Sequence, residues 1–249
     1  MAEPRNTAMP TVVLVHGAFA DASSWNGVIA RLQNEGVPVT APANPLRGII
    51  ADAAYASSVF AQIEALVLAV GHSYGGAVIT NAAANAKNVL GLVYVAAFAP
   101  DEGEVLGVVE DDSKDSVLNS ALVPRTYPNA SGGSTSEFYI DPAKAREAFA
   151  GDLSDEQAAL IAATQRPVSE LAFSEPNGPP AWKHLPSWAV VATGDKAAGT
   201  DVTRSMAQRA GAKITEVAGS HVIMISQPEA VTNVIMEAVA AVTAVPAGG

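Results

Sequence analysis

The sequence lacks cysteine altogether, which excludes disulfides, catalytic thiolates and cysteine-based zinc sites. Basic residues are scarce as well, because 14 lysines and arginines stand against 25 aspartates and glutamates, for a formal net charge of −11. A chain this acidic, with no basic run, is poorly suited to nucleic acid or to an anionic membrane surface. It has no apolar run approaching the roughly 18 residues of a membrane span, and residues 1–9 lack the apolar stretch of a secretory signal. The expected location is therefore the cytoplasm.

What the sequence does contain is apolar material for one large core, since 49% of its 249 residues are hydrophobic. Short β-branched and apolar runs predict strands at 11–15, 37–40, 66–70, 89–95, 187–192 and 213–217. Helical patterns fall between and after these runs, at 23–35, 52–63, 74–86, 200–210 and 228–242. This alternation predicts an α/β fold, with a mostly parallel sheet and helices on both faces. The tail from Pro246 is expected to fray.

The composition changes between residues 100 and 185, where short helical patterns replace the regular alternation. Capping residues predict helices that begin at Asp141 and at Ser154. We expect this segment, 100–185, to be a helical cap insertion within an α/β core made of residues 1–99 and 186–249.

The side chains of this insertion allow two interpretations. A Ser/Gly loop is expected near Ser131–Ser136. The aromatic residues either line a pocket or form a small core of their own (Tyr127, Phe138, Tyr139, Phe149, Phe173 and Trp182). The acidic run predicts a solvated face rather than a metal site (Asp101, Glu102, Glu104, Glu110, Asp111, Asp112 and Asp115).

The most informative stretch is Gly71-His72-Ser73-Tyr74-Gly75, because a buried-strand pattern precedes it and a helix pattern follows it. This order predicts a nucleophile elbow, a sharp strand-to-helix turn that presents a serine above a sheet. Gly71 and Gly75 remove side chains that would collide across the turn. The amides at the helix N-terminus would then suit an oxyanion developing next to the serine. The alternative is an ordinary glycine-rich turn with a capping serine.

A serine nucleophile needs a base, and the base needs a partner that fixes its tautomer. Of the four histidines, only His221 follows a late strand at the carboxyl edge of the predicted sheet, where open α/β sheets bind ligands. Asp195 follows an apolar strand upstream of it, and Asp101 is the alternative acid. We predict Ser73 as nucleophile, His221 as base and Asp195 as the orienting acid. The other histidines fit this role less well (His16, His72 and His184).

These features resemble the α/β-hydrolase superfamily, particularly its group of small esterases, plant methylesterases and hydroxynitrile lyases. The resemblance rests on VLVHGAF, GHSYGG, the TGD turn and Ser220-His221, and it covers about residues 11–99 and 186–243. It implies that Ser73, Asp195 and His221 form a triad, in the chain order of α/β-hydrolases. It also implies that the backbone amides of Ala18 and Tyr74 are the oxyanion donors.

The resemblance implies a serine hydrolase that cleaves a small carboxylic ester through an acyl-enzyme, without a metal or an organic cofactor. One alternative is a hydroxynitrile lyase on the same scaffold. The lyases carry a hydroxyl residue and a lysine where this chain has Gly17 and Val222, which weighs against cyanohydrin chemistry. The other alternative is a non-catalytic protein that binds a small ligand, which would have no use for a triad. The expected partner is a small ester, and homo-oligomerisation stays open.

Overall fold

The computed structural model of the protein describes residues 9–129 and 132–244. A six-stranded sheet forms its centre, with the strand order β2-β1-β3-β4-β8-β9 and parallel pairing throughout. The predicted α/β fold with a mostly parallel sheet is therefore confirmed. The loop expected at Ser131–Ser136 lies partly outside the described residues, and the tail from Pro246 lies wholly outside them.

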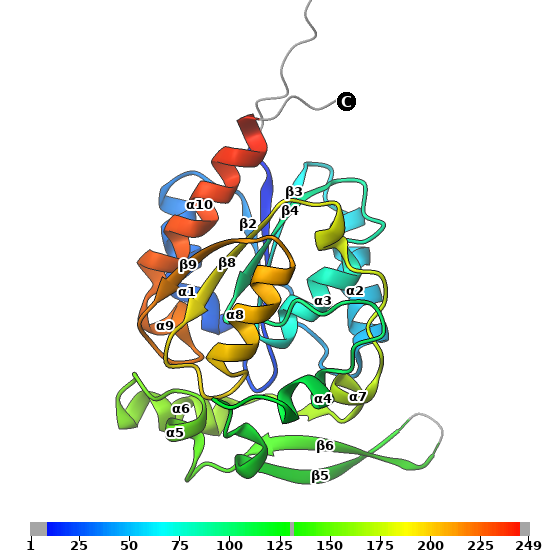
Figure 1. Cartoon of the computed structure of the whole chain (residues 1–249), viewed down its shortest axis with the longest axis vertical. Helices are drawn as coiled ribbons and strands as arrows, with labels where there is room; N and C mark the ends of the chain where they lie inside the picture. Colours follow the sequence, from blue (N-terminus) through cyan, green and yellow to red (C-terminus); the bar gives the residue numbers. More distant parts are fainter. Residues whose placement is uncertain (1–8, 130–131, 245–249) are drawn as a thin grey trace, which may run out of the picture.

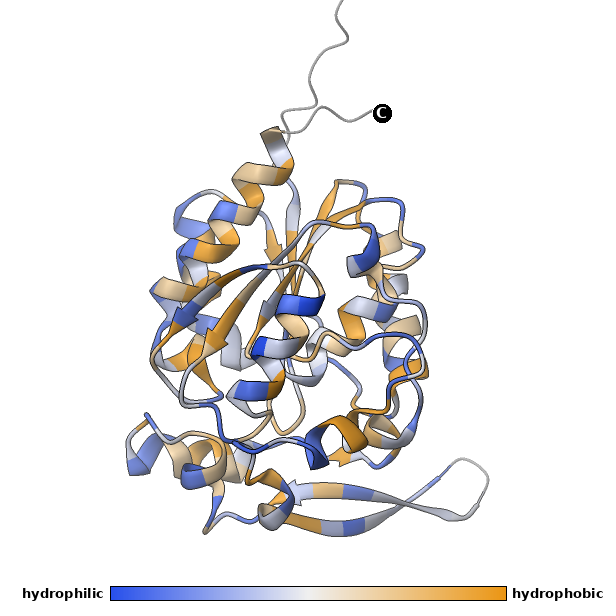
Figure 2. Cartoon of the chain, viewed as in Figure 1, coloured by the Kyte–Doolittle hydropathy of each residue, from blue (hydrophilic) through white to orange (hydrophobic). Residues whose placement is uncertain are grey.

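The six strands agree closely with the apolar runs of the sequence. Their bounds are β1 (Thr11–Val15), β2 (Val39–Thr40), β3 (Val67–His72), β4 (Val89–Val95), β8 (Ser187–Ala192) and β9 (Lys213–Val217). Every residue of β3 and β8 is buried, as expected of central parallel strands covered on both faces. Figure 2 shows the central strands as predominantly hydrophobic. Because all six strands run in one direction, the segments after them meet at a single edge of the sheet.

Helices cover both faces of this sheet (Figure 1). On one face α10 packs on β3, β4 and β8, and it also contacts α1 and α9. On the other face α3 packs on β1, β3 and β4 and contacts α2, while α8 lies against β8 and β9. Their bounds are η1 (Ala22–Trp25), α1 (Asn26–Asn34), α2 (Ile49–Ala61), α3 (Tyr74–Ala82), α8 (Thr200–Arg209), α9 (Ile223–Ser226) and α10 (Pro228–Ala244). Within the described ranges, none of the helices has both the length and the hydropathy to cross a membrane.

The segment between β4 and β8 lies across the carboxyl edge of the sheet (Figure 1). Its helix α6 (Asp155–Thr164) begins at Ser154 with a full capping box, as the sequence predicts. The helix expected from Asp141 is a single turn, α5 (Ala145–Ala148). The remaining helical pieces are α4 (Leu106–Asp111), η2 (Leu118–Ala121), α7 (Leu171–Ser174) and η3 (Ala181–Lys183).

This segment also contains a second sheet that the expectation of a helical cap did not include. It is a three-stranded antiparallel sheet made of β5 (Leu122–Pro128), β6 (Ser134–Ile140) and β7 (Val168–Ser169). Strands β5 and β6 are largely exposed or half-buried and rich in polar residues, so they lack the continuous apolar run of the central strands. Cross-strand pairing along their whole length contributes to the stability of both strands. The division of the chain into core and cap stays a prediction.

Candidate active site

Ser73 lies in the sharp turn between β3 and α3, with φ 54° and ψ −125°. A positive φ is uncommon for a residue with a side chain, and such strain is held where the surrounding structure requires it. A Cβ on Gly71 would lie 2.5 Å from the Gly75 carbonyl oxygen, and a Cβ on Gly75 would collide with the Val15 carbonyl oxygen. The predicted collision across the turn is therefore confirmed for Gly71, whereas Gly75 makes room for the backbone at the end of β1.

His221 and Asp195 come together from the ends of β9 and β8. The Nδ1 of His221 lies 2.8 Å from Oδ2 of Asp195, and both side chains are almost fully buried. The other carboxylate oxygen, Oδ1, accepts the backbone N–H groups of Ala197 at 2.9 Å and Ala198 at 3.1 Å. With the carboxylate as acceptor, Nδ1 of His221 carries a proton, and Nε2 is left as the acceptor.

Ser73 and His221 line one cavity with about 260 Å³ of empty space. Most of the other residues around it are apolar (Ala18, Phe19, Tyr74, Phe98, Glu110, Leu118, Phe149, Phe173 and Ala198). Within the described part of the chain, the Ser73 hydroxyl makes no hydrogen bond to His221. Catalytic hydrogen bonds are often long without substrate and tighten when it binds. The arrangement is chemically suited to nucleophilic attack by Ser73 with His221 as the base.

The two residues named as oxyanion donors, Ala18 and Tyr74, line this same cavity. Tyr74 is the first residue of α3, so its amide belongs to the group that a helix start leaves without an intrahelical acceptor. Ala18 follows Gly17, where a Cβ would lie 2.5 Å from the Ser73 Cβ and 2.8 Å from the His72 carbonyl oxygen. Only a glycine lets this loop approach the elbow so closely.

The side chain of Tyr74 is held by the buried carboxylate of Asp52, which the sequence analysis did not identify. Its hydroxyl donates to Asp52 at 2.8 Å, and Asp52 also accepts the backbone N–H groups of Arg47 and Gly48. Burial raises the pKa of Asp52, and the hydrogen bond from Tyr74 acts in the opposite direction. The residue that follows the serine is thereby held at both its backbone and its hydroxyl.

Two of the other histidines, His72 and His16, are buried and form hydrogen bonds with the backbone. The Nε2 of His72 donates to the carbonyl of His221 at 3.0 Å, and the two rings lie 4.7 Å apart. Burial holds the pKa of His72 well below its usual range, so this ring is neutral and supports the main chain of His221. His16 accepts the Asn44 N–H at 2.9 Å, and burial lowers its pKa to about 4. His184 is exposed.

Two members of the acidic run, Asp101 and Glu110, have different surroundings. Asp101 forms an ion pair with Lys183 at 2.6 Å, and this hydrogen bond lowers the pKa of Asp101. Glu110 is wrongly placed by the expectation of a solvated face, because it is only 4% exposed and lines the cavity. Nothing in its local sequence distinguishes it from its exposed neighbours Asp111 and Asp112. Among the described residues, no cluster of three acidic or histidine side chains could hold a metal ion.

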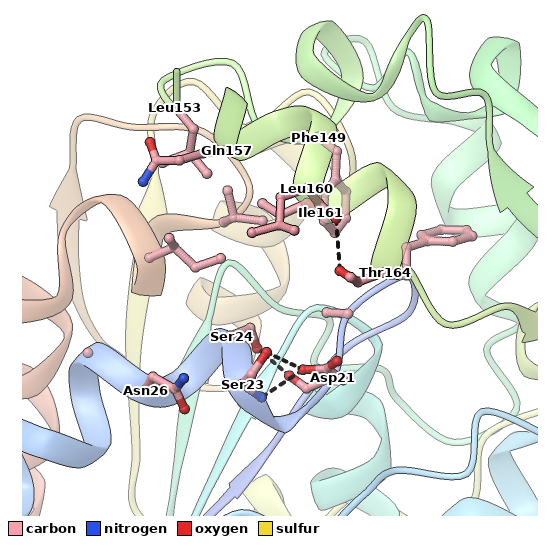
Figure 3. Close-up of a pocket in the computed structure, with 15 residues that line it drawn as sticks. Asp21, Ser23, Ser24, Asn26, Phe149, Leu153, Gln157, Leu160, Ile161 and Thr164 are labelled. Atoms are coloured by element: carbon pink, nitrogen blue, oxygen red, sulfur yellow. Dashed lines mark hydrogen bonds between the residues drawn. The ribbon is translucent and has the colours of Figure 1, made fainter. Parts of the chain in front are cut away.

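A larger groove lies next to the cavity, with about 940 Å³ of empty space (Figure 3). Helix α6 supplies apolar side chains such as Leu160 and Ile161, and the segment around η1 supplies polar ones such as Asp21. Phe19 and Phe149 line both spaces, with their rings edge to face at 6.2 Å. Of the six aromatic residues weighed as pocket lining, Phe149 and Phe173 contact the cavity.

Comparison with known proteins gives a family and a set of similar folds. A family model described as the alpha/beta hydrolase family matches residues 12–234. Curated proteins give no match. Polyneuridine aldehyde esterase is 22% identical, with a TM-score of 0.78, over 93% of this chain and 99% of that one.

Two further solved structures are similar at comparable identity. A pyrethroid hydrolase from Sphingobium faniae JZ-2 is 20% identical, with a TM-score of 0.75, over 94% of this chain and 98% of that one. The methylesterase MES16 from Arabidopsis is 18% identical, with a TM-score of 0.76, over 93% and 99%. At these identities the likeness shows the fold.

Proposed function

The chain belongs to the alpha/beta hydrolase family, and from that premise we propose that it is a serine esterase that cleaves small carboxylic esters through an acyl-enzyme. The observation that carries this proposal is the buried pair between His221 Nδ1 and Asp195 Oδ2 at 2.8 Å. His221 of this pair lines the same cavity as Ser73, a serine held at a positive φ. An ordinary glycine-rich turn has no need of such a pair beside its serine.

The reaction follows from the hydrogen-bonding capacities of these groups. The Ser73 hydroxyl attacks the ester carbonyl while Nε2 of His221 accepts its proton. Asp195 stabilises the imidazolium that forms, and the amides of Ala18 and Tyr74 stabilise the tetrahedral oxyanion. His221 then passes the proton to the departing alkoxide. Water attacks the acyl-enzyme with His221 again as base, which regenerates the free serine.

The surroundings of Ser73 indicate a substrate that is mainly apolar next to the scissile bond. Phe98, Phe149 and Phe173 border the cavity, which is smaller than the groove beside it. The neighbouring groove, which shares Phe19 and Phe149, is the space for the rest of a longer ester. Among the described residues that line the cavity there is no lysine, which weighs against a cyanohydrin lyase.

Fluorophosphonate labelling together with hydrolysis of 4-nitrophenyl esters tests the proposal. The wild-type protein should be labelled and should turn over the ester, whereas Ser73→Ala should lose labelling and at least about a thousandfold in kcat. Ser58→Ala is the matched control, because Ser58 is an exposed serine of α2 whose hydroxyl bonds only its own helix. Undiminished labelling of a folded Ser73→Ala protein would remove the nucleophile assignment. Labelling without ester turnover would favour the lyase.

A further inference from the structure

Glu110 is the polar side chain in the cavity that the triad chemistry does not use. It lies on α4, is 4% exposed, and borders the cavity that Ser73 and His221 also line. Its Oε1 atom is buried and has no hydrogen-bond partner among the described residues. A buried polar atom without a partner is costly to the folded state, and such groups in native proteins commonly have a functional reason.

Burial and two nearby negative charges favour the neutral form of Glu110. Burial, then the negative charges of Asp111 on its own helix and of Asp195 after β8, raise the pKa of Glu110 to about 8. The segment after α4 is fastened to the Asp195 loop, since Ser116 donates to the Ala197 carbonyl at 2.6 Å. Across the cavity, the titratable groups are His221 and Tyr74. At neutral pH Glu110 is therefore mostly a neutral acid that can donate an O–H bond.

We propose that Glu110 is a specificity-determining residue that donates a hydrogen bond to an acceptor oxygen on the substrate. The favoured substrates are then esters that carry a keto or ether oxygen a few atoms from the scissile carbonyl. This proposal rests on the esterase function proposed above. The unpartnered Oε1 gains a partner when such a substrate binds, so the cost of burying it falls in the complex.

A neutral acceptor fits the cavity better than a substrate cation does. The other residues that line the cavity near Glu110 are mostly apolar, such as Leu118, Phe98 and Phe173. Aromatic faces can attract an ammonium group, but the Glu110 carboxyl beside them is itself mostly protonated, so the hydration that a cation loses is not replaced. An ammonium would also have to displace the proton of Glu110 before it could form an ion pair. A keto or ether oxygen uses that proton directly.

Paired substrates isolate this hydrogen bond. The 4-nitrophenyl esters of pentanoic acid, 4-oxopentanoic acid and 3-methoxypropanoic acid have similar lengths and differ in the acceptor oxygen. For the wild-type protein, we expect KM for the oxygen-bearing esters to be about three- to tenfold below that for pentanoate. Glu110→Leu should abolish this difference, and Glu110→Gln, which keeps a neutral donor, should preserve most of it. Asp112→Asn, at an exposed position after the same helix, should behave like the wild type.

The pH dependence of KM gives a readout that a merely structural role would not move. In the wild type, KM for the oxygen-bearing esters should rise as pH passes through about 8, because Glu110 loses the proton that it donates. KM for pentanoate should stay flat over the same range, and Glu110→Gln should make both profiles flat.

Each result separates this proposal from its rivals. Equal loss on all three esters in Glu110→Leu, with no pH-dependent difference in the wild type, would overturn the acceptor role and leave only a structural one. A preference for an ester with an ammonium in place of the oxygen, strengthening above pH 8 and lost in Glu110→Gln, would overturn it in favour of a cation site. If pentanoate itself is not hydrolysed through Ser73, the esterase function fails. If pentanoate is hydrolysed and the contrast is missing, only the Glu110 proposal fails.

Discussion

At the scale of single residues, the assignment of Asp195 as the acid depends on its hydrogen bond with His221. Asp195→Asn would place an amide N–H₂ or the remaining oxygen opposite His221 Nδ1. Because Oδ1 already accepts the Ala197 and Ala198 amides, the new N–H₂ group takes the position facing the ring. The imidazole is then forced into the tautomer with Nε2 protonated, which cannot accept the proton of Ser73.

We therefore expect Asp195→Asn to lower kcat for a 4-nitrophenyl ester by about ten-thousandfold, the size of the effect in a well-studied triad. Asp101→Asn is the matched control, since that carboxylate pairs with Lys183 at the surface and should matter little. Steady-state kinetics on both variants, with circular dichroism to verify folding, measures the contrast. The reverse ranking would transfer the acid role to Asp101 and leave the roles of Ser73 and His221 intact.

The sequence predicts those residues of the site that have both a suitable side chain and a position at the end of a strand. Ser73, Asp195 and His221 each follow a strand that the sequence predicts, so the parallel sheet brings them to one edge. Glu110 has no such signal, because its burial depends on how α4 packs over the cavity. An acidic residue beside two other acidic residues is normally solvated. The burial of Glu110 is therefore visible only in the three-dimensional structure.

The same contrast holds at the scale of secondary-structure elements. Central strands such as β3 and β8 are predictable because complete burial demands an unbroken apolar run. The β5–β6 hairpin has one side towards solvent and contains prolines at Pro124 and Pro128, both of which weaken a strand pattern. Its formation depends on pairing between residues such as Leu122 and Ile140, which local sequence patterns do not report.

Phe149, at the end of α5, gives a prediction at the element scale. Its ring lies 5.0 Å from the His221 ring and 6.2 Å from the Phe19 ring, and it lines both the cavity and the larger groove beside it. Phe149→Leu should remove ring atoms that border both the cavity and the groove, which leaves more room for a long acyl chain. The ratio of kcat/KM for a 4-nitrophenyl octanoate over a butyrate should rise about fivefold or more, since each extra methylene gains room to be buried.

The ratio of two substrates cancels any common loss from disturbing His221. Leu171→Ala serves as the control, because Leu171 is an exposed apolar residue that lines neither space. An unchanged chain-length profile in a folded Phe149→Leu protein would show that the groove does not take part in ester binding.

At the scale of the whole molecule, buried titratable groups make folding stability depend on pH. His16 has its pKa lowered to about 4 because the folded state favours the neutral ring. The stability that the neutral His16 ring contributes is present above about pH 6.5 and is lost as the pH falls towards 4. Glu110 has the opposite effect, because its pKa is raised from 4.5 to about 8 in the folded state and stability is therefore lost as the pH rises. The two effects offset each other between about pH 4.5 and pH 6.5, so together these groups favour maximum stability in mildly acidic solution.

The Glu110 effect has a definite sign and a variant that removes it. Between pH 4.5 and about 8 the folded protein keeps a proton that the unfolded chain releases, so the free energy of unfolding falls as pH rises, by up to about 1.4 kcal/mol per pH unit from this group. Glu110→Gln carries no such proton and should gain stability relative to the wild type between pH 5 and pH 8.5. Glu147→Gln, at an exposed position on α5, should follow the wild type across the range. Urea unfolding at four pH values measures the three curves, and a constant gap between Glu110→Gln and the wild type would mean that the Glu110 carboxyl ionises alike in the folded and unfolded states.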